Sequence, residues 1–456
     1  MADTLLSVGL DVGTTTTQMI VSRLTVENRA TGFAVPEMEI ASREILYKGN
    51  VHFTPLLDGK RVDKEGLKAL VDREYALAGI KREQVDTGAV IITGETSRKE
   101  NARTALEALS EYAGEFVVAT AGPDLESVLS AKGAGATEYS VQTGKTVLHM
   151  DIGGGTSNLS FIENGKITHT GCLNVGGRLL KFDENRKLTY LSPVLAGLTD
   201  LRLGDTPTES QLQAITDQLV NGLHMAAGLL QTTELLEKLT TKENARLWHP
   251  QKPEVISFSG GVADCIEKDT PAFAYGDLGV LLGRAIKNSN LCQNYRLGEQ
   301  TIRATVIGAG CHSTQLSGST VFYADVALPK KNLPVAVLTP PITIETVKAA
   351  YAAQDTENMV LAIPGSLSLN YQQIKDLAQT LITGSRGERI VCLEADMAKA
   401  LGHCIRLAEP SRPCLCIDGL HLENESFLDI GSPVGPALPV VIKTLVLSTE
   451  GKSGTG

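Results

Sequence analysis

Two short polar runs carry the residue types that bind a nucleoside triphosphate and a metal ion. Each begins with Asp-x-Gly and continues with glycine or threonine: one covers residues 11–17 and the other residues 151–158. Glycine lets backbone N–H groups approach phosphate oxygens closely, and threonine adds hydroxyl donors. Aspartate holds Mg²⁺ through its bound waters, since Mg²⁺ keeps much of its hydration and uses one or two carboxylates. The pattern favours phosphoryl chemistry, which needs mainly positioning and charge neutralisation.

Each polar run lies between two apolar segments, which predicts a strand–turn–strand unit. Residues 5–10 precede the first run as a buried strand, and residues 19–21 resume the apolar character after it. Residues 146–150 and 159–162 flank the second run in the same way, and Asn164-Gly165 then predicts a hairpin turn. The two aspartates are 140 residues apart, so the repeat predicts two similar domains rather than a solenoid.

Later segments extend this α/β pattern. Residues 206–209 predict a helix start with a capping box, followed by an apolar stripe to Leu230. Residues 255–259 predict a strand that ends at Gly260-Gly261, and residues 304–310 predict part of a helix of small residues. After Leu316 prolines become frequent, and strand and helix candidates alternate, which indicates a third α/β unit.

Other motifs have simpler structural explanations. A single Asp-x-Gly is a common turn after a strand, so the nucleotide interpretation depends on two copies together with Gly260-Gly261. Gly144-Lys145-Thr146 resembles the end of a Walker loop, but Tyr139 stands where its first glycine would be. Cys414 and Cys416 lie in an apolar strand pattern and are interpreted as buried thiols rather than metal ligands. His149 is expected to be a packed core residue.

Composition excludes several classes of protein. The chain has 456 residues, and its 42% apolar and 21% charged residues are ordinary for a globular protein. Its formal net charge of −10 argues against a general nucleic-acid binder, which usually carries a basic face. No apolar run reaches the roughly eighteen residues of a membrane span, and residues 1–4 lack a signal-peptide pattern. The eight cysteines favour reduced thiols in a cytoplasm.

The ordered motifs resemble the actin–hexokinase–heat-shock-chaperone ATPase superfamily over roughly residues 5–315. Residues 11–15 and 151–156 look like its two phosphate loops, residues 259–261 like its adenosine motif, and residues 91–95 and 307–310 like its interdomain connecting segments. The resemblance implies ATP and Mg²⁺ as cofactors. It implies Asp11, Asp151 and Glu95 as the catalytic residues, with Asp11 and Asp151 holding the metal through water. The implied nucleotide-binding residues are Gly13, Thr14, Thr15, Gly153, Gly154, Gly155, Thr156, Ser259, Gly260 and Gly261.

The role of Glu95 has two interpretations. In the superfamily an acid or amide near the first connecting segment helps to orient the attacking water, and Glu95 follows a buried strand in that position. The alternative is an acid at a helix N-terminus, favoured by the helix dipole.

Three runs look more specifically like the ethanolamine ammonia-lyase reactivating factor, and this match extends over the whole chain. They are residues 9–18, 94–101 and 427–435. The resemblance implies an ATP-dependent, chaperone-like factor that frees damaged cobalamin from ethanolamine ammonia-lyase, so that fresh adenosylcobalamin can enter. Adenosylcobalamin would be reached only by way of the lyase, without nucleic acid or membrane partners. An association with a bacterial microcompartment and a homo-oligomeric state stay open.

We therefore expect an α/β fold with two actin-like, ribonuclease-H-like ATPase domains around a nucleotide cleft. The expected units are residues 1–145, residues 146–316, whose last helix returns to the first domain, and a C-terminal α/β unit at 317–456. Two other functions stay open. A small-molecule kinase of the same superfamily would need a carboxylate base beside an acceptor hydroxyl, which no motif identifies. A nucleotide-switched scaffold or filament protein would polymerise with rising concentration.

Overall fold

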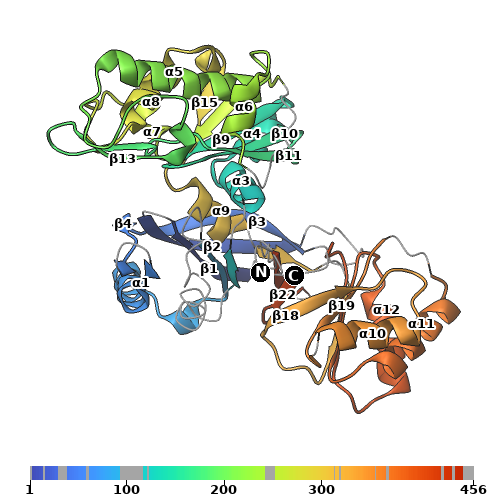
Figure 1. Cartoon of the computed structure of the whole chain (residues 1–456). Coiled ribbons are helices and arrows are strands. Elements are labelled where there is room, and N and C mark those ends of the chain that lie inside the picture. The colour runs from blue at the N-terminus through green and yellow to red at the C-terminus, as the bar shows by residue number, and fades with distance from the viewer. Residues whose placement is uncertain are drawn as a thin grey trace, which may run out of the picture.

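The structure is a computed structural model that describes most of the chain. The described residues are 3–13, 16–28, 38–57, 61–92, 117–120, 123–241, 252–312, 314–317, 320–354, 356–365, 369–422, 426–433 and 437–444. They form three large sheets with helices packed on them, and the second sheet lies apart from the first and third across a pair of helices (Figure 1). The expected mixed α/β class is confirmed.

The first sheet is built around β1 and has the order β3-β2-β1-β7-β8. Strands β1 to β3 are antiparallel, whereas β7 and β8 run parallel to β1. Helix α1 covers one face, and its apolar residues Leu67 and Val71 are buried there. The strands and helix are β1 (Asp3–Val12), β2 (Thr16–Asn28), β3 (Met38–Lys48), β4 (His52–Phe53), β5 (Leu56–Leu57), β6 (Arg61–Val62), α1 (Lys64–Ala78), β7 (Thr87–Ile92) and β8 (Val117–Thr120).

The second sheet repeats the first in both order and direction. Its order is β11-β10-β9-β14-β15, with β9 to β11 antiparallel and β14 and β15 parallel to β9. This is the strand arrangement of a ribonuclease-H-like domain, so the predicted internal repeat is confirmed. Positive φ angles at Asn164 and Gly165 make the predicted hairpin turn. The strands are β9 (Val147–Ile152), β10 (Ser157–Glu163), β11 (Lys166–Leu173), β14 (Val255–Ser259) and β15 (Tyr295–Leu297), with a small ribbon of β12 (Leu180–Phe182) and β13 (Leu188–Leu191).

Helices α5 and α8 pack on the outer face of the second sheet. Helix α5 begins later than predicted: Thr208 is its N-cap and forms the capping box with Gln211, because the Thr208 side chain accepts from the Gln211 N–H. The predicted stripe is buried from Leu212 to Ala226, but Leu230 lies beyond the helix and is exposed. The helices of this unit are α5 (Glu209–Ala226), α6 (Glu234–Leu239), α7 (Asp264–Glu267) and α8 (Gly279–Lys287).

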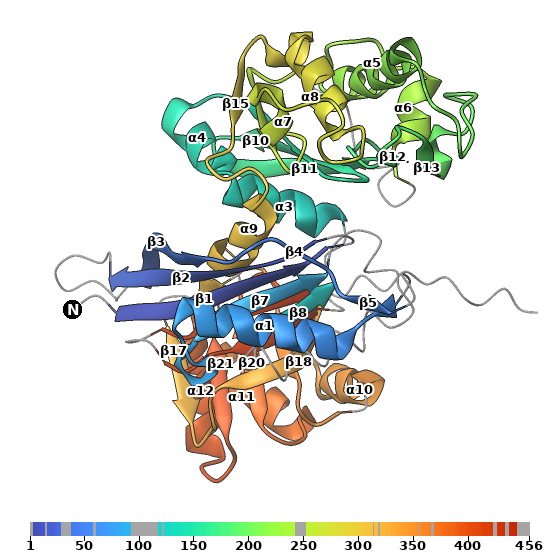
Figure 2. The same cartoon turned by 90° about the vertical axis from the view of Figure 1, so that its left-hand side faces the viewer.

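Two crossing helices separate the first and second sheets. Helix α9 (Ala304–His312) lies on β1, and α3 (Pro123–Gly133) packs between α9 and the second sheet, followed by α4 (Ala136–Thr143) (Figure 2). The helices approach closely because glycines face them: a Cβ added to Gly308 would lie 2.0 Å from the Leu129 carbonyl oxygen. The expected unit boundaries after residues 145 and 316 stay predictions, and α3 and α4 pack on the second sheet although they precede residue 145.

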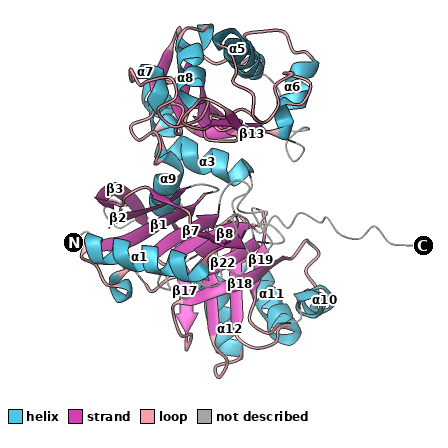
Figure 3. Cartoon of the chain, turned by 60° about the vertical axis from the view of Figure 1, so that its left-hand side comes forward, coloured by secondary structure: helices cyan, strands magenta, loops and turns pink. Residues whose placement is uncertain are grey.

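The third sheet combines a parallel half and an antiparallel half. Strands β18 to β21 are parallel and alternate with helices α10 to α12, as the alternating pattern predicts (Figure 3). Val441 on β23 packs against Ile91 of β7 and Ala309 of α9, which joins this unit to the first. The elements are β16 (Thr314–Leu316), β17 (Val321–Ala324), β18 (Lys330–Val337), α10 (Ile344–Gln354), β19 (Val360–Ile363), α11 (Tyr371–Gly384), β20 (Arg389–Leu393), α12 (Ala398–Ala408), β21 (Cys414–Ile417), β22 (Ser426–Ile430) and β23 (Pro439–Thr444).

Candidate functional site

The two Asp-x-Gly runs close in the same way. Asp11 and Asp151 are each the second-last residue of their strands, β1 and β9. The Gly13 N–H donates to the Thr16 carbonyl at 2.9 Å, and the Gly153 N–H donates to the Thr156 carbonyl at the same distance. Both loops therefore form at the carboxyl-terminal edge of a sheet, with glycine backbone held in an equivalent turn.

Three of the predicted site residues lie outside the described part of the chain. They are Thr14 and Thr15 of the first loop and Glu95 after β7. Their roles stay predictions, and so does the first connecting segment beyond Ile92.

Asp151 is buried, and both of its carboxylate oxygens accept hydrogen bonds from hydroxyl groups. Ser259 Oγ donates to Oδ1 at 2.5 Å, and Thr305 Oγ1 donates to Oδ2 at 3.4 Å. Burial raises the pKa of Asp151 to about 6, although the two hydrogen bonds oppose that shift. A cation beside this carboxylate would offset the cost of keeping it ionised in a low-dielectric site.

Ser259 and His149 form a buried chain of hydrogen bonds behind Asp151. Because the single Ser259 hydroxyl hydrogen goes to Asp151, the same oxygen accepts from His149 Nε2 at 2.9 Å. The other ring nitrogen, Nδ1, then accepts from Ser257 Oγ at 3.1 Å. Burial lowers the pKa of His149 to about 3, so the ring is neutral, as expected for a packed core residue. The Ser259 hydroxyl therefore acts on the site through Asp151.

The two glycines after β14 have different surroundings. Gly260 has a φ of +87°, and a Cβ added there would lie 2.3 Å from the Ile152 carbonyl oxygen. No described atom lies within 4 Å of a Cβ added at Gly261. Gly260 is thus required by the backbone itself, whereas Gly261 faces open space where a ligand could approach.

A second glycine-rich segment supports the loop of Gly153 to Gly155. The Gly177 N–H donates to the Gly153 carbonyl at 3.0 Å, and the Arg178 N–H donates to the Gly154 carbonyl at 2.6 Å. The Arg178 side chain then lies along Gly154, and its Nε donates to Asp277 at 3.4 Å. The second loop therefore has the aliphatic part of Arg178 against it, a neighbour that sequence analysis missed.

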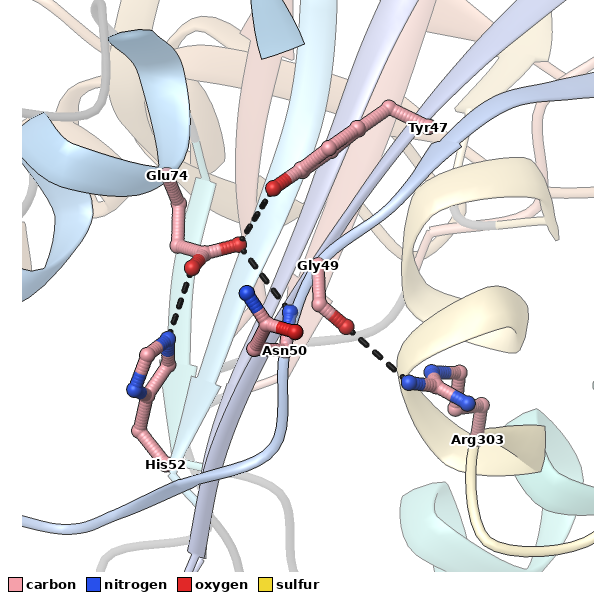
Figure 4. Close-up of polar contacts among 6 residues, drawn as sticks. All are labelled: Tyr47, Gly49, Asn50, His52, Glu74 and Arg303. Atoms are coloured by element: carbon pink, nitrogen blue, oxygen red, sulfur yellow. Dashed lines mark hydrogen bonds and ion pairs between the residues drawn. The ribbon is translucent and has the colours of Figure 1, made fainter. Parts of the chain in front are cut away.

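A short segment that leads into α9 contacts both halves of the site. The Gly260 N–H donates to the Thr301 carbonyl at 3.0 Å, and Thr305 donates to Asp151. On the other side Gln18 Nε2 donates to the Ile302 carbonyl at 3.3 Å, and Arg303 Nη2 donates to the Gly49 carbonyl at 3.0 Å (Figure 4). We call residues 301–305 the bridge segment.

Glu74 fixes the part of the first unit that receives Arg303. Its buried carboxylate accepts from Tyr47 Oη at 2.9 Å and from the Asn50 N–H at 3.2 Å, and His52 Nε2 lies 2.6 Å from it (Figure 4). These contacts hold residues 47–52 against α1. The bridge segment therefore meets a part of the first unit that hydrogen bonds tie to α1.

Sequence analysis also did not identify the two amide residues that lie opposite the aspartates on the neighbouring strands. Gln18 stands opposite Asp11, and Asn158 stands opposite Asp151. Each amide follows its aspartate by seven residues, a repeated spacing that the sequence does contain. Glu126 on α3 is buried and accepts from Asn158 Nδ2 at 2.8 Å, a contact that only the packing of α3 creates.

The carboxylates of Asp11 and Asp151 are hard oxygen groups of the kind that bind Mg²⁺. Among the described residues, no three His, Cys, Asp or Glu side chains gather into a group that could hold a metal ion. Cys414 and Cys416 are thiols that lie fully buried in β21. No helix in the described ranges is both long and apolar enough to cross a membrane.

Comparisons with known proteins agree over nearly the whole chain. The family model described as "Ethanolamine utilisation protein EutA" matches residues 3–448. A protein of Salmonella typhimurium named "Ethanolamine ammonia-lyase reactivase EutA" is 40% identical, covering 97% of this chain and 98% of that protein. The protein of the same name from Escherichia coli is 38% identical with the same coverage.

Solved structures align more distantly. The Ppx/GppA family member of Aquifex aeolicus aligns with a TM-score of 0.42 and 12% identity, over 67% of this chain and 97% of that one. The ethanolamine utilization protein EutJ of Carboxydothermus hydrogenoformans aligns with a TM-score of 0.33 and 19% identity, over 67% of this chain and 88% of that one. The family match and the two curated relatives lead to one conclusion: this chain belongs to the EutA family of ethanolamine utilisation proteins.

Proposed function

We propose that this protein is an ATP-dependent reactivating factor for ethanolamine ammonia-lyase, releasing damaged cobalamin from that enzyme. The observation that carries the proposal is the 40% identity, over 97% of the chain, to a protein named for this activity. The partner is therefore the lyase, and adenosylcobalamin enters the lyase after release. We place this activity in the cytoplasm, where cysteine thiols stay reduced.

The paired loops support the nucleotide part of the proposal. Asp11 and Asp151 would hold Mg²⁺ through water, and Mg²⁺ when bound neutralises phosphate charge. Backbone N–H groups of the two glycine loops and the hydroxyls of Thr14, Thr15 and Thr156 would contact the phosphates. Gly261, with Gly260 fixing the turn, would lie along the adenosine. We keep Glu95 as the residue that orients the attacking water.

The bridge segment supports a coupling between nucleotide and partner. It contacts Gly260 and Asp151 on one side and Gln18 and Gly49 on the other. A ligand that engages both loops would therefore favour one arrangement of the two halves. A lyase that binds one arrangement more tightly would sense this as a coupling free energy of about 1–3 kcal/mol.

The experiment begins with lyase that is blocked by an inactive cobalamin. This protein, ATP, Mg²⁺ and free adenosylcobalamin are added, and ammonia formation is followed. Activity should return only in the complete mixture. Asp11→Asn and Asp151→Asn should each lower ATP hydrolysis by about 10–100-fold, and the double variant should lose little more, because the residues act as a unit. Asp269→Asn, which changes a fully exposed carboxylate, is the matched control and should behave like the unaltered protein.

Other outcomes separate the remaining functions. Hydrolysis of ATP without recovery of the lyase would refute the reactivating factor. A phosphorylated product with a panel of small alcohols and sugars would identify a kinase instead. Nucleotide-dependent polymerisation without hydrolysis-linked recovery would favour a scaffold protein.

A further inference from the structure

Two buried side-chain amides occupy equivalent positions in the two halves of the site. Gln18 on β2 pairs with Asp11 of β1, and Asn158 on β10 pairs with Asp151 of β9. Residues directly opposite each other on antiparallel strands place their side chains on the same face, with Cβ atoms about 5 Å apart. Each aspartate therefore has an amide as its nearest neighbour across the strand.

The orientation of both amides follows from their partners. Gln18 contacts the Ile302 carbonyl at 3.3 Å, and Asn158 contacts the Glu126 carboxylate at 2.8 Å. A backbone carbonyl and an ionised carboxylate accept hydrogen bonds and have none to donate, so each amide turns its nitrogen toward its partner. The two amide oxygens then face the other way.

Both of these oxygens are buried. Only 4% of Gln18 and 4% of Asn158 is exposed, and neither Gln18 Oε1 nor Asn158 Oδ1 has a hydrogen-bond partner within the described part of the chain. Native proteins seldom leave a buried acceptor unpaired, because its lost hydration is not replaced. Two such acceptors at repeated positions point to a ligand that brings hydrogen-bond donors.

We propose that Gln18 and Asn158 accept hydrogen bonds from the water molecules of the divalent cation that Asp11 and Asp151 hold. This rests on the proposed function. Phosphate oxygens are acceptors and would repel the amide oxygens, whereas water bound to a cation is a strong donor. Mg²⁺ and Mn²⁺ retain such waters when few protein groups coordinate them. The site then contains one carboxylate and one amide oxygen from each half.

The amides are positioning residues for the cation, and their own supports come from the helices between the sheets. Ile302 belongs to the bridge segment, and Glu126 lies on α3. A shift of either element would turn an amide and alter the hold on the hydrated cation. Cation affinity should therefore depend on residues that never approach the nucleotide.

The test measures Mn²⁺ binding to the full chain with a non-hydrolysable ATP analogue, by electron paramagnetic resonance. Gln18→Met keeps the side-chain length but removes the acceptor, and should weaken Mn²⁺ binding about tenfold. Gln18→Glu loses the donor to Ile302 but keeps an acceptor oxygen, and should bind Mn²⁺ at least as tightly as the unaltered protein. Gln218→Met is the matched control, since Gln218 on α5 also donates its Nε2 to a backbone carbonyl, that of Leu198.

Asn158 needs a paired change, because its removal would leave Glu126 without this donor. The double variant Asn158→Asp with Glu126→Gln reverses the hydrogen bond and keeps an acceptor beside Asp151, so Mn²⁺ affinity should be retained. Asn158→Leu with Glu126→Leu removes both polar groups and should weaken Mn²⁺ binding about tenfold. Binding of the analogue without metal, and the melting temperature without ligands, verify that each variant is folded.

The outcomes distinguish this inference from the proposed function. Mn²⁺-dependent analogue binding in the unaltered protein, with equal affinity in Gln18→Met, would overturn the inference alone. A lower hydrolysis rate in Gln18→Met at unchanged Mn²⁺ affinity would also overturn it and assign the amide to the attacking water. If the unaltered protein binds the analogue without any dependence on Mn²⁺, the metal site itself is refuted, and the inference with it.

Discussion

Asp151 combines a buried carboxylate with hydroxyl donors on both oxygens. Ser259 and Thr305 favour its ionised form, but burial has the larger effect and raises the pKa to about 6. Keeping the carboxylate ionised therefore costs the ligand-free protein stability, and a ligand that brings positive charge would offset this cost. His149 behind it stays neutral, so the chain through Ser259 supplies orientation and no compensating charge.

This gives a prediction for Asp151→Asn in the absence of metal and nucleotide. The folded-state pKa lies above the ordinary value of 3.8, so the contribution of Asp151 to stability is greatest below about pH 4 and is lost as the pH rises through about 6. The neutral amide avoids that loss. At pH 7.5 the variant should be more stable by up to ~3 kcal/mol, seen as a higher melting temperature, and this advantage should shrink toward pH 4.5.

The same variant should lose hydrolysis while it gains stability, which a purely structural role would not produce. Asp269→Asn, on an exposed carboxylate, should change neither property. A melting temperature of Asp151→Asn at or below that of the unaltered protein at pH 7.5 would contradict the predicted burial cost.

At the scale of elements, α3, α9 and β1 can cross closely because glycines, which have no side chain, lie at their contacts. Gly133 and Gly308 let the helices touch through their backbones, and Gly9 of β1 approaches the Val306 carbonyl and Gly310 in the same way. The second connecting segment predicted at residues 307–310 is thus a packed helix between the two repeated sheets. The bridge segment runs directly into this closely packed helix.

Gly308→Ala should therefore destabilise the protein by about 1–3 kcal/mol, because the added methyl group meets the Leu129 backbone and one helix must move. Gly222→Ala on α5 is the matched control. There the methyl group would meet the end of the Leu239 side chain, which can turn away, and the helix gains up to ~1 kcal/mol in propensity. Melting temperatures compare the two. If Gly308→Ala were as stable as Gly222→Ala, the contact between α9 and α3 would be able to accommodate a methyl group, which would contradict this prediction.

At the scale of the whole molecule, the third sheet joins the first through β23. Val441 packs with Ala89 and Ile91 of β7 and with Leu129 and Ala309 of the crossing helices. Its neighbour Val440 points to the other face and belongs to the third unit's own core. The third unit therefore shares buried apolar surface with the elements that carry the candidate site.

Hydrogen exchange can test this shared core. Val441→Ala should speed amide exchange in β7 and α9, because the lost methyl groups leave a cavity beside them. Val440→Ala removes the same atoms from the opposite face, and should speed exchange in β18 and β22 while leaving β7 unchanged. Equal exchange in β7 for the two variants would mean that the third unit and the first unfold independently.

The sequence by itself determined the features that neighbouring residues create. The closures from Gly13 to Thr16 and from Gly153 to Thr156 span four residues each, so composition and order suffice to predict both loops. The same local pattern occurs twice, and it predicted two similar domains. The N-cap of α5 is Thr208 and not the predicted Thr206. This shows the limit of such rules, since two nearby threonines could each cap the helix.

Only the tertiary structure decided which side chains meet at the loops. Ser259 stays a predicted nucleotide-binding residue, and its hydroxyl is bonded to Asp151 and His149, residues more than 100 positions away in the chain. Gln18 meets Ile302, and Asn158 meets Glu126, because strand register and helix crossing bring them together. Local sequence patterns predict how a strand turns. They cannot predict which distant groups are buried against it, because that depends on the packing of the whole chain.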